Sequence, residues 1–174
     1  MTKNALIEHL YNRGCIDKFR VFLGEETATF LLWNFAGQLK GYQRYTPNAP
    51  KNHKNPKEAR YFTRSSEPCL WGLDHLPKNI NTPVFVTESI FKAMALINSG
   101  YNAVSSLGSN IPKSLLRQMK LSRIDWICIG DNDKAGLKFS RTFLIGATSP
   151  DLDELSRLEV ITLANRLLGE YDGR

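Results

Sequence analysis

The second half of the chain alternates between short apolar runs and longer segments with helical periodicity. Three apolar runs have the length and composition of buried strands, and they span residues 83–88, 102–107 and 123–131. Segments with the periodicity of helices follow them, at residues 89–100, 112–120, 134–144 and 153–169, the last ending at Gly169. Because strands and helices alternate, the pattern predicts an α/β, doubly wound domain with a mainly parallel sheet over residues 81–174.

The first half of the chain has a different pattern. Residues 3–12 predict a short amphipathic helix, and residues 28–45 predict two strands joined by a tight turn that contains a glycine. A loop rich in Pro, Asn and Lys is expected over residues 46–59, followed by another extended segment. A proline-rich stretch separates the two halves, so we expect a small basic α+β lobe over residues 1–80.

Positive charge is concentrated in this first half. The net charge is +6, a balance that favours polyanionic partners. Seven cations lie between Gly37 and Arg64 against one acid, and they are Lys40, Arg44, Lys51, Lys54, Lys57, Arg60 and Arg64. Such a stretch is typical of a surface that follows a nucleic-acid backbone, where binding weakens as salt is added. We expect Lys40, Arg44 and Arg60 to contact phosphates.

Aromatic residues interleave with these cations, namely Tyr42, Tyr45, Tyr61 and Phe62. Aromatic side chains can stack on bases of a single strand. On predicted strands, however, inward-facing core positions are the simpler interpretation and the one that we favour. Trp33, Trp71 and Trp126 are likewise expected in the core.

Cysteine spacing argues against a structural metal site. Cys15, Cys69 and Cys128 stand far apart and form no CxxC pair, whereas zinc sites and disulfide frameworks need closely spaced ligands or paired cysteines. No apolar run is long enough to span a membrane, and the first residues do not resemble a signal peptide. We therefore expect a cytoplasmic protein with reduced cysteines.

Acidic residues end two of the predicted strands. Glu88 ends the first strand, and Asp131 and Asp133 come at the end of the third. If these strands are neighbours, three carboxylates meet at one sheet edge, where they repel one another and require a cation. Hard oxygen ligands suit Mg²⁺. Taken alone, Asp-Asn-Asp before a helix is more typical of a capped, solvent-exposed turn, but the three acids together favour a metal site.

A resemblance to the TOPRIM domain of DNA primases, topoisomerases and some nucleases supports this interpretation. It rests on TPVFVTESIFKAMALINSGYNAVSSLGSNIP followed by WICIGDNDKAG. Bacterial and phage primases in particular show the same order of features, which are here Glu88, then Ser106-Leu107-Gly108, then Asp131, Asp133, Ala135 and Gly136. The residues from 28 onward also resemble the basic lobe that precedes TOPRIM in phage and mitochondrial-helicase-type primases.

The resemblance implies an activity and its site residues. It implies a magnesium-dependent primase-like nucleotidyltransferase that makes short primers on single-stranded DNA, with Mn²⁺ able to substitute. Glu88, Asp131 and Asp133 would be catalytic metal ligands. The segment SPDLDEL resembles the third acidic motif of primases and would place Asp151 near the metals. Lys92 and Lys134 flank the acids and would contact phosphate, unless they are solvated helix lysines.

Nucleoside triphosphates and a replicative helicase are the partners that the resemblance implies, and a phage-encoded protein would act in the host cytoplasm. The sequence itself shows neither a zinc-ribbon module nor a helicase phosphate-binding loop.

Two departures from the primase pattern keep other functions open. Lys92 stands where bacterial primases carry an aspartate, and the resulting pattern is reminiscent of type IA topoisomerases. The segment between Asp133 and Asp151 is also shorter than expected for a full helix and strand, so we expect a trimmed final crossover. A TOPRIM nuclease and a non-catalytic nucleic-acid-binding module therefore remain alternatives.

Overall fold

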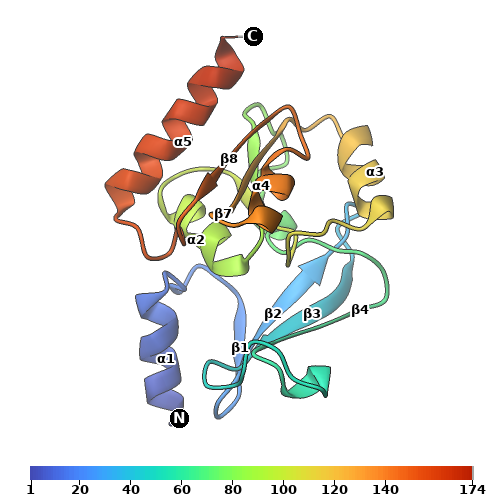
Figure 1. Ribbon diagram of the computed structural model, residues 1–174. Helices are drawn as coiled ribbons and strands as arrows, with labels where there is room; N and C mark the ends of the chain where they lie inside the picture. Colours follow the sequence, from blue (N-terminus) through green and yellow to red (C-terminus); the bar gives the residue numbers. More distant parts are fainter. Residues whose placement is uncertain (174) are drawn as a thin grey trace. The chain divides into compact units, whose positions relative to one another are not determined.

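The computed structural model describes residues 1–173 and divides into two compact units, Met1–Cys69 and Leu70–Arg174. The first unit holds helix α1 (Lys3–Asn12) and a four-stranded antiparallel sheet (Figure 1). Its strands lie in sequence order and are β1 (Val21–Leu23), β2 (Ala28–Trp33), β3 (Leu39–Tyr45) and β4 (Tyr61–Ser65). The mixed helix and sheet content expected of this lobe is confirmed.

The hairpin between β2 and β3 forms where the sequence predicts it. Burial alternates strictly along β2, so that Ala28, Phe30 and Leu32 face the core, as the period of a strand requires. The turn uses Gly37 with φ +71°, a left-handed conformation that glycine adopts without steric cost. Oδ1 of Asn34 accepts hydrogen bonds from two backbone N–H groups of the turn and fixes its shape.

The second unit contains a four-stranded sheet in the order β6-β5-β7-β8, with every neighbouring pair parallel. Its strands are β5 (Val84–Thr87), β6 (Ala103–Ser105), β7 (Trp126–Asp131) and β8 (Ile145–Ser149). β5 and β6 are buried along their whole length, and β7 is buried up to its last residue. Continuous burial of this kind is expected when helices cover both faces of a parallel sheet.

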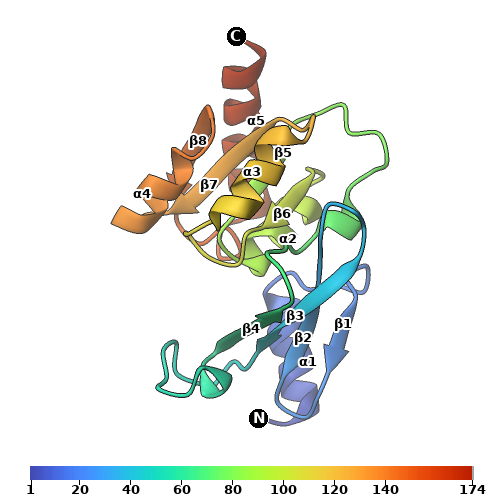
Figure 2. The ribbon, with the colours of Figure 1, turned by 90° about the vertical axis from the view of Figure 1, so that its right-hand side faces the viewer.

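Four helices cover this sheet, and they are α2 (Ile90–Asn98), α3 (Lys113–Leu121), α4 (Lys134–Ser140) and α5 (Arg157–Asp172). The connection from β5 to β6 runs in one direction along the sheet, and those from β6 to β7 and from β7 to β8 run in the other. Right-handed crossovers then place α2 on one face and α3 and α4 on the opposite face. Figure 2 shows α3 and α4 on the viewer's side of β7, with α5 behind the sheet, and α5 contacts α2. The predicted doubly wound α/β fold is confirmed.

The final crossover is short, as the spacing of Asp133 and Asp151 predicts. Both elements form, although α4 ends at Ser140, before the predicted limit of residue 144, and β8 pairs with β7 over five residues. The crossover is short because α4 packs directly on the end of β7: a Cβ on Gly136 would collide with the backbone of Asp131. The last helix also differs from the prediction. It begins at Arg157, directly after the N-cap Ser156, which forms a capping box with Glu159, and it continues through Gly169 to Asp172.

The two units divide between Cys69 and Leu70, upstream of the boundary expected after residue 80. The reason is a bridge between Trp71 and Ser105, in which each backbone N–H donates to the other residue's carbonyl at 3.0 Å. Trp71 thereby attaches the connecting segment to the outer edge of β6. Among the described residues, no helix is both long and apolar enough to cross a membrane.

Candidate functional site

Two acidic residues lie at the carboxyl ends of neighbouring strands in the second sheet. The winding of the chain reverses between β5 and β7, and in open α/β sheets ligands bind at such a switch point. Glu88 directly follows β5 and Asp131 ends β7. The parallel register aligns Thr87 with Ile129, so both acids lie just beyond the last paired residues. The two strands are neighbours, as the predicted convergence of these acids requires.

Glu88 is half-buried and fixed by a hydrogen bond. The backbone N–H of Asp131 donates to Oε1 of Glu88 at 2.9 Å. Burial raises the pKa of this carboxyl, the hydrogen bond partly opposes the rise, and the negative charge of Asp131 adds to it. A carboxyl whose pKa lies closer to neutrality is better suited to act as a general base than an ordinary exposed one.

Lys92 lies in the first turn of α2 and reaches the same edge of the sheet. Its residue is only 2% exposed, yet its Nζ forms an ion pair with Oδ1 of Asp131 and a second, at 3.0 Å, with Oδ1 of Asp151. Burial lowers the pKa of the amine, but the two carboxylates outweigh burial and raise the pKa overall. Lys92 is therefore a protonated, fixed cation that connects α2 with β7 and the segment after β8.

Asp133 has a local structural role. It is the N-cap of α4, and its Oδ1 accepts a hydrogen bond from the backbone N–H of Gly136 at 2.7 Å. This is the capped turn that Asp-Asn-Asp predicts when taken alone. Capping uses one carboxylate oxygen, and Asp133 is exposed, so its second oxygen can still face a ligand. Lys134, the next residue, is exposed.

The Ser-Leu-Gly turn follows β6 at the same edge of the sheet. Leu107 has φ +66°, and it is the single non-glycine residue with positive φ among residues 1–173. Side chains hold this strained backbone in place: Ser105 Oγ accepts from the N–H of Leu107 at 3.1 Å, and Ser106 Oγ donates to the carbonyls of Thr87 and Gly108. Strain that is held this firmly is typical of functional sites.

A protein-family model matches most of the second unit. Residues 85–158 match the model described as Toprim-like, and the match takes in the switch point, the Ser-Leu-Gly turn and all four acids. Residues 85–158 form a TOPRIM domain. A search of curated protein sequences finds no match to the chain.

Solved structures with the same fold are primase catalytic domains. The DnaG primase catalytic domain bound to ssDNA matches with a TM-score of 0.60 and 20% identity, over 94% of this chain and 60% of that one. The E. coli primase catalytic core matches with a TM-score of 0.62 and 20% identity, over 94% of this chain and 59% of that one. The primase fragment of the bacteriophage T7 primase-helicase protein matches with a TM-score of 0.61 and 14% identity, over 95% of this chain and 73% of that one. The chain thus spans about 60% of the length of the first two of these structures, and at these identities the similarity establishes the fold.

TOPRIM domains generally bind Mg²⁺, and the side chains present fit such an ion. Glu88, Asp131 and Asp133 each bond to the protein through one carboxylate oxygen, and the other oxygen has no hydrogen-bond partner within the described chain. Mg²⁺ is commonly bound by one or two carboxylates together with water and substrate phosphates. In the part of the chain that the structure describes, no three Asp, Glu, His or Cys side chains are grouped as ligands of one ion. The arrangement therefore suits a shared site of this kind rather than an all-protein cage.

Some basic side chains of the first unit bond to other groups of that unit, and others are exposed. Arg44 donates to the carbonyl of Lys57 and lies over the Phe62 ring, with 5.3 Å from guanidinium carbon to ring centroid. Nε of Arg60 donates to the carbonyl of Ala49 at 3.0 Å. Lys40 pairs with Glu67 at 3.6 Å. These three side chains fasten the loop and the hairpin, whereas the loop lysines are exposed, namely Lys51, Lys54 and Lys57.

The aromatic residues of this unit contact one another. Tyr45 is buried and stacks on Tyr61 with 5.1 Å between ring centroids, and Tyr42 meets Phe62 edge to face at 6.3 Å. Tyr45 agrees with the inward-facing interpretation. Tyr42, Tyr61 and Phe62 are only partly buried, and Tyr42 and Phe62 lie on the face of the sheet opposite Tyr45, where the interpretation does not hold. Trp71 and Trp126 are buried as predicted, whereas Trp33 is partly exposed. The three cysteines are free and buried.

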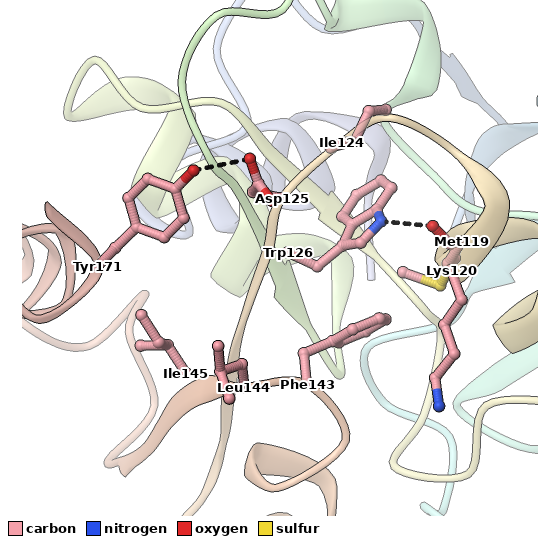
Figure 3. A pocket seen from close by; sticks show the side chains of 9 residues that line it. All are labelled: Met119, Lys120, Ile124, Asp125, Trp126, Phe143, Leu144, Ile145 and Tyr171. Carbon is pink, nitrogen blue, oxygen red and sulfur yellow. Dashed lines mark hydrogen bonds between the residues drawn. The ribbon is translucent and has the colours of Figure 1, made fainter. Parts of the chain in front are cut away.

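A pocket of about 240 Å³ lies at the other end of the TOPRIM strands (Figure 3). Trp126, which begins β7, lines it together with Phe143 and Leu144, and Tyr171 donates to Asp125 at 2.7 Å beside it. Trp126 and Asp131 are five positions apart along β7, or about 16 Å at the rise of a strand. This pocket is therefore separate from the acidic edge.

Sequence reasoning missed the position of Lys92 between two carboxylates. One signal was present, because Lys92 interrupts the otherwise apolar run Ile90–Leu96 of a helix that packs on the sheet. A lysine in such a run is buried unless the helix turns it outward, and a buried lysine requires acidic partners. The identity of those partners depends on the crossover to β8, which the sequence did not predict.

Proposed function

We propose that this chain is the catalytic part of a magnesium-dependent, primase-type nucleotidyltransferase that makes short primers on single-stranded DNA. The observation that carries the proposal is the pairing of Glu88 and Asp131 at the switch point of a TOPRIM domain. The similarity to primase catalytic domains covers 94% of the chain and so extends beyond the TOPRIM residues into the first unit. That extension favours a primase over a TOPRIM nuclease, whose acids would be the same.

Glu88, Asp131 and Asp133 are the residues that would hold Mg²⁺, and Mn²⁺ is expected to substitute. The ion supplies charge neutralisation for the triphosphate and for the pyrophosphate that leaves. The chain's own contribution is positioning. The hydrogen bond between Glu88 and Asp131 fixes the relation of two ligands, and the cap of α4 fixes the third.

Primer extension requires one proton transfer. The 3′-hydroxyl of the growing primer attacks the α-phosphorus of the incoming nucleotide, a new P–O bond forms, and the bond to pyrophosphate breaks. The hydroxyl proton must pass to a base. Glu88 either completes the coordination of the ion or accepts this proton, and burial, which raises the pKa of its carboxyl, suits it to the second role. Lys134 is exposed next to Asp133 and would contact the nucleotide phosphates.

The first unit supplies the surface for the template. Lys40, Arg44 and Arg60 hold the loop and hairpin, and the loop lysines between them are free to contact successive phosphates. Each phosphate that a lysine neutralises releases a counterion, which makes affinity dependent on salt. A replicative helicase is a further partner that we propose, because one structure of the same fold belongs to a primase-helicase protein.

The test is a primer assay with the full chain. Single-stranded DNA, labelled nucleoside triphosphates and Mg²⁺ or Mn²⁺ are incubated with the wild type and with the double variant Asp131→Asn, Asp133→Asn. Asparagine retains the capping ability of position 133. At position 131 it removes one of the two ion pairs of Lys92, so circular dichroism must show that the double variant is folded. New short products from the wild type alone support the proposal. Shortened DNA would indicate a nuclease, and salt-dependent DNA binding without either product would indicate a non-catalytic module.

A further inference from the structure

Lys92 lies at the acidic edge, where its Nζ pairs with both Asp131 and Asp151. We infer that its ammonium group replaces a second divalent ion, so that this site binds one metal ion and Asp151 serves as a partner of Lys92 rather than as a metal ligand. The inference rests on the proposed function in one respect, namely that the remaining acids hold a metal ion.

Burial makes Lys92 a permanent member of the site. A charged group with 2% exposure is tolerated only when it is paired and hydrogen-bonded. Its two neighbours in α2, Phe91 and Ala93, are also buried. Asp131 and Asp151 provide the two ion pairs that this position requires. Lys134 differs, because it is exposed and can leave the site.

The position of the ammonium excludes a second ion. Two-metal sites for phosphoryl transfer hold their ions about 4 Å apart and bridge them with a shared carboxylate. Asp131 is the acid placed to bridge, since its backbone N–H binds Glu88 and its carboxylate contacts Lys92. The carboxylate of Asp131 pairs with the Nζ of Lys92, and the same Nζ pairs with Oδ1 of Asp151 at 3.0 Å. An ion at that place would meet a fixed positive charge and two carboxylate oxygens already bonded to it.

This arrangement divides the four acids by role. Glu88 and Asp133 keep an oxygen for the metal ion, and Asp131 offers one oxygen to the ion and the other to Lys92. The side chain of Asp151 is 51% exposed, and its carboxylate forms an ion pair with Lys92. Charge neutralisation at the edge is thus shared between one exchangeable ion and one built-in cation.

Counting bound Mn²⁺ tests the inference without relying on activity. Mn²⁺ alone is titrated into the full-length, metal-free chain, and bound ion is counted by isothermal titration calorimetry and by loss of the free Mn²⁺ signal in electron paramagnetic resonance. We expect one ion for the wild type, one for Lys92→Arg, and two for Lys92→Met, which frees Asp131 and Asp151. Adding Asp151→Asn to Lys92→Met should return the count to one. Lys134→Met is the matched control and should leave it at one.

Each outcome separates this inference from the proposed function. Two ions on the wild type, or an unchanged count in folded Lys92→Met, would overturn the inference alone. Asp151→Asn keeps the test decisive if Lys92→Met does not fold: the inference requires that it still binds one ion, and a loss of that ion overturns it. No bound ion on the wild type removes the metal from the proposed function as well. One bound ion without primer synthesis upholds the inference and contradicts the proposed function.

Discussion

Glu88 accepts a hydrogen bond from the backbone N–H of Asp131 at 2.9 Å, and this bond joins the ends of the two strands between which the sheet reverses its winding. The bond needs only an acceptor oxygen at position 88, whereas metal binding and proton transfer need a charged carboxylate. The structural role of Glu88 and its proposed catalytic role can therefore be separated by substitution.

Glu88→Gln should keep the fold and lose primer synthesis, because the amide oxygen still accepts the hydrogen bond but carries no charge. Glu88→Ala should lose the bond as well and lower the free energy of unfolding by a further ~1–2 kcal/mol, the usual cost of an unsatisfied buried donor. Urea denaturation and the primer assay measure the two effects. Primer synthesis by Glu88→Gln would contradict the proposed role.

Stability should depend on pH through Glu88 in metal-free buffer. Its pKa in the folded protein is raised above the ordinary value of 4.5, chiefly by burial. The folded protein therefore retains a proton that the unfolded chain has released, and the associated stability is full below 4.5 and is lost as pH rises through the folded pKa. The free energy of unfolding of the wild type relative to Glu88→Gln should fall over that interval. A difference between the two that does not vary with pH would show that Glu88 is not perturbed.

Two glycines in helices should respond in opposite directions to alanine. A Cβ on Gly136 in α4 would collide with the backbone of Asp131, and we expect Gly136→Ala to destabilise the chain by at least ~1–3 kcal/mol. Gly169 in α5 has nothing within 4 Å of the same position, so Gly169→Ala should stabilise it by up to ~1 kcal/mol. Thermal and urea denaturation report both changes. Equal effects would mean that α4 does not pack against β7 as described.

Binding to single-stranded DNA should depend on the exposed loop lysines. Changing Lys51, Lys54 and Lys57 together to Gln should weaken binding and reduce the slope of log affinity against log salt by roughly 2, because about 0.7 counterions are released for each phosphate contact on a single strand. A matched variant removes three exposed cations of α3 instead, Lys113, Arg117 and Lys120. The proposed template surface is excluded if both triple variants reduce the slope equally.

The sequence predicted the strands of the TOPRIM sheet well where burial on both faces makes them continuously apolar, as in β5 and β7. It did not predict β8, whose sequence Ile-Gly-Ala-Thr-Ser is small and partly exposed. A strand of that composition is recognised from its pairing with β7 rather than from its own pattern.

The candidate site was predictable to a similar degree. Residue type and position at strand ends identified Glu88 and Asp131, because parallel neighbours deliver their carboxyl ends to one edge. The contacts of Lys92 could not be read from the sequence, since Asp131 and Asp151 lie far from it along the chain and meet it only through the folded crossovers. Arg44 and Arg60 show the same limit, because their carbonyl partners depend on the path of the loop.

The bridge between Trp71 and Ser105 limits how far the protein can be shortened from its N-terminus. A fragment that began at residue 81 would remove Trp71 and uncover the outer side of β6. Unprotected strand edges pair readily with other chains and promote aggregation. A fragment that begins before Leu70 keeps this protection, and it is the piece of the chain to produce when the TOPRIM unit is studied by itself.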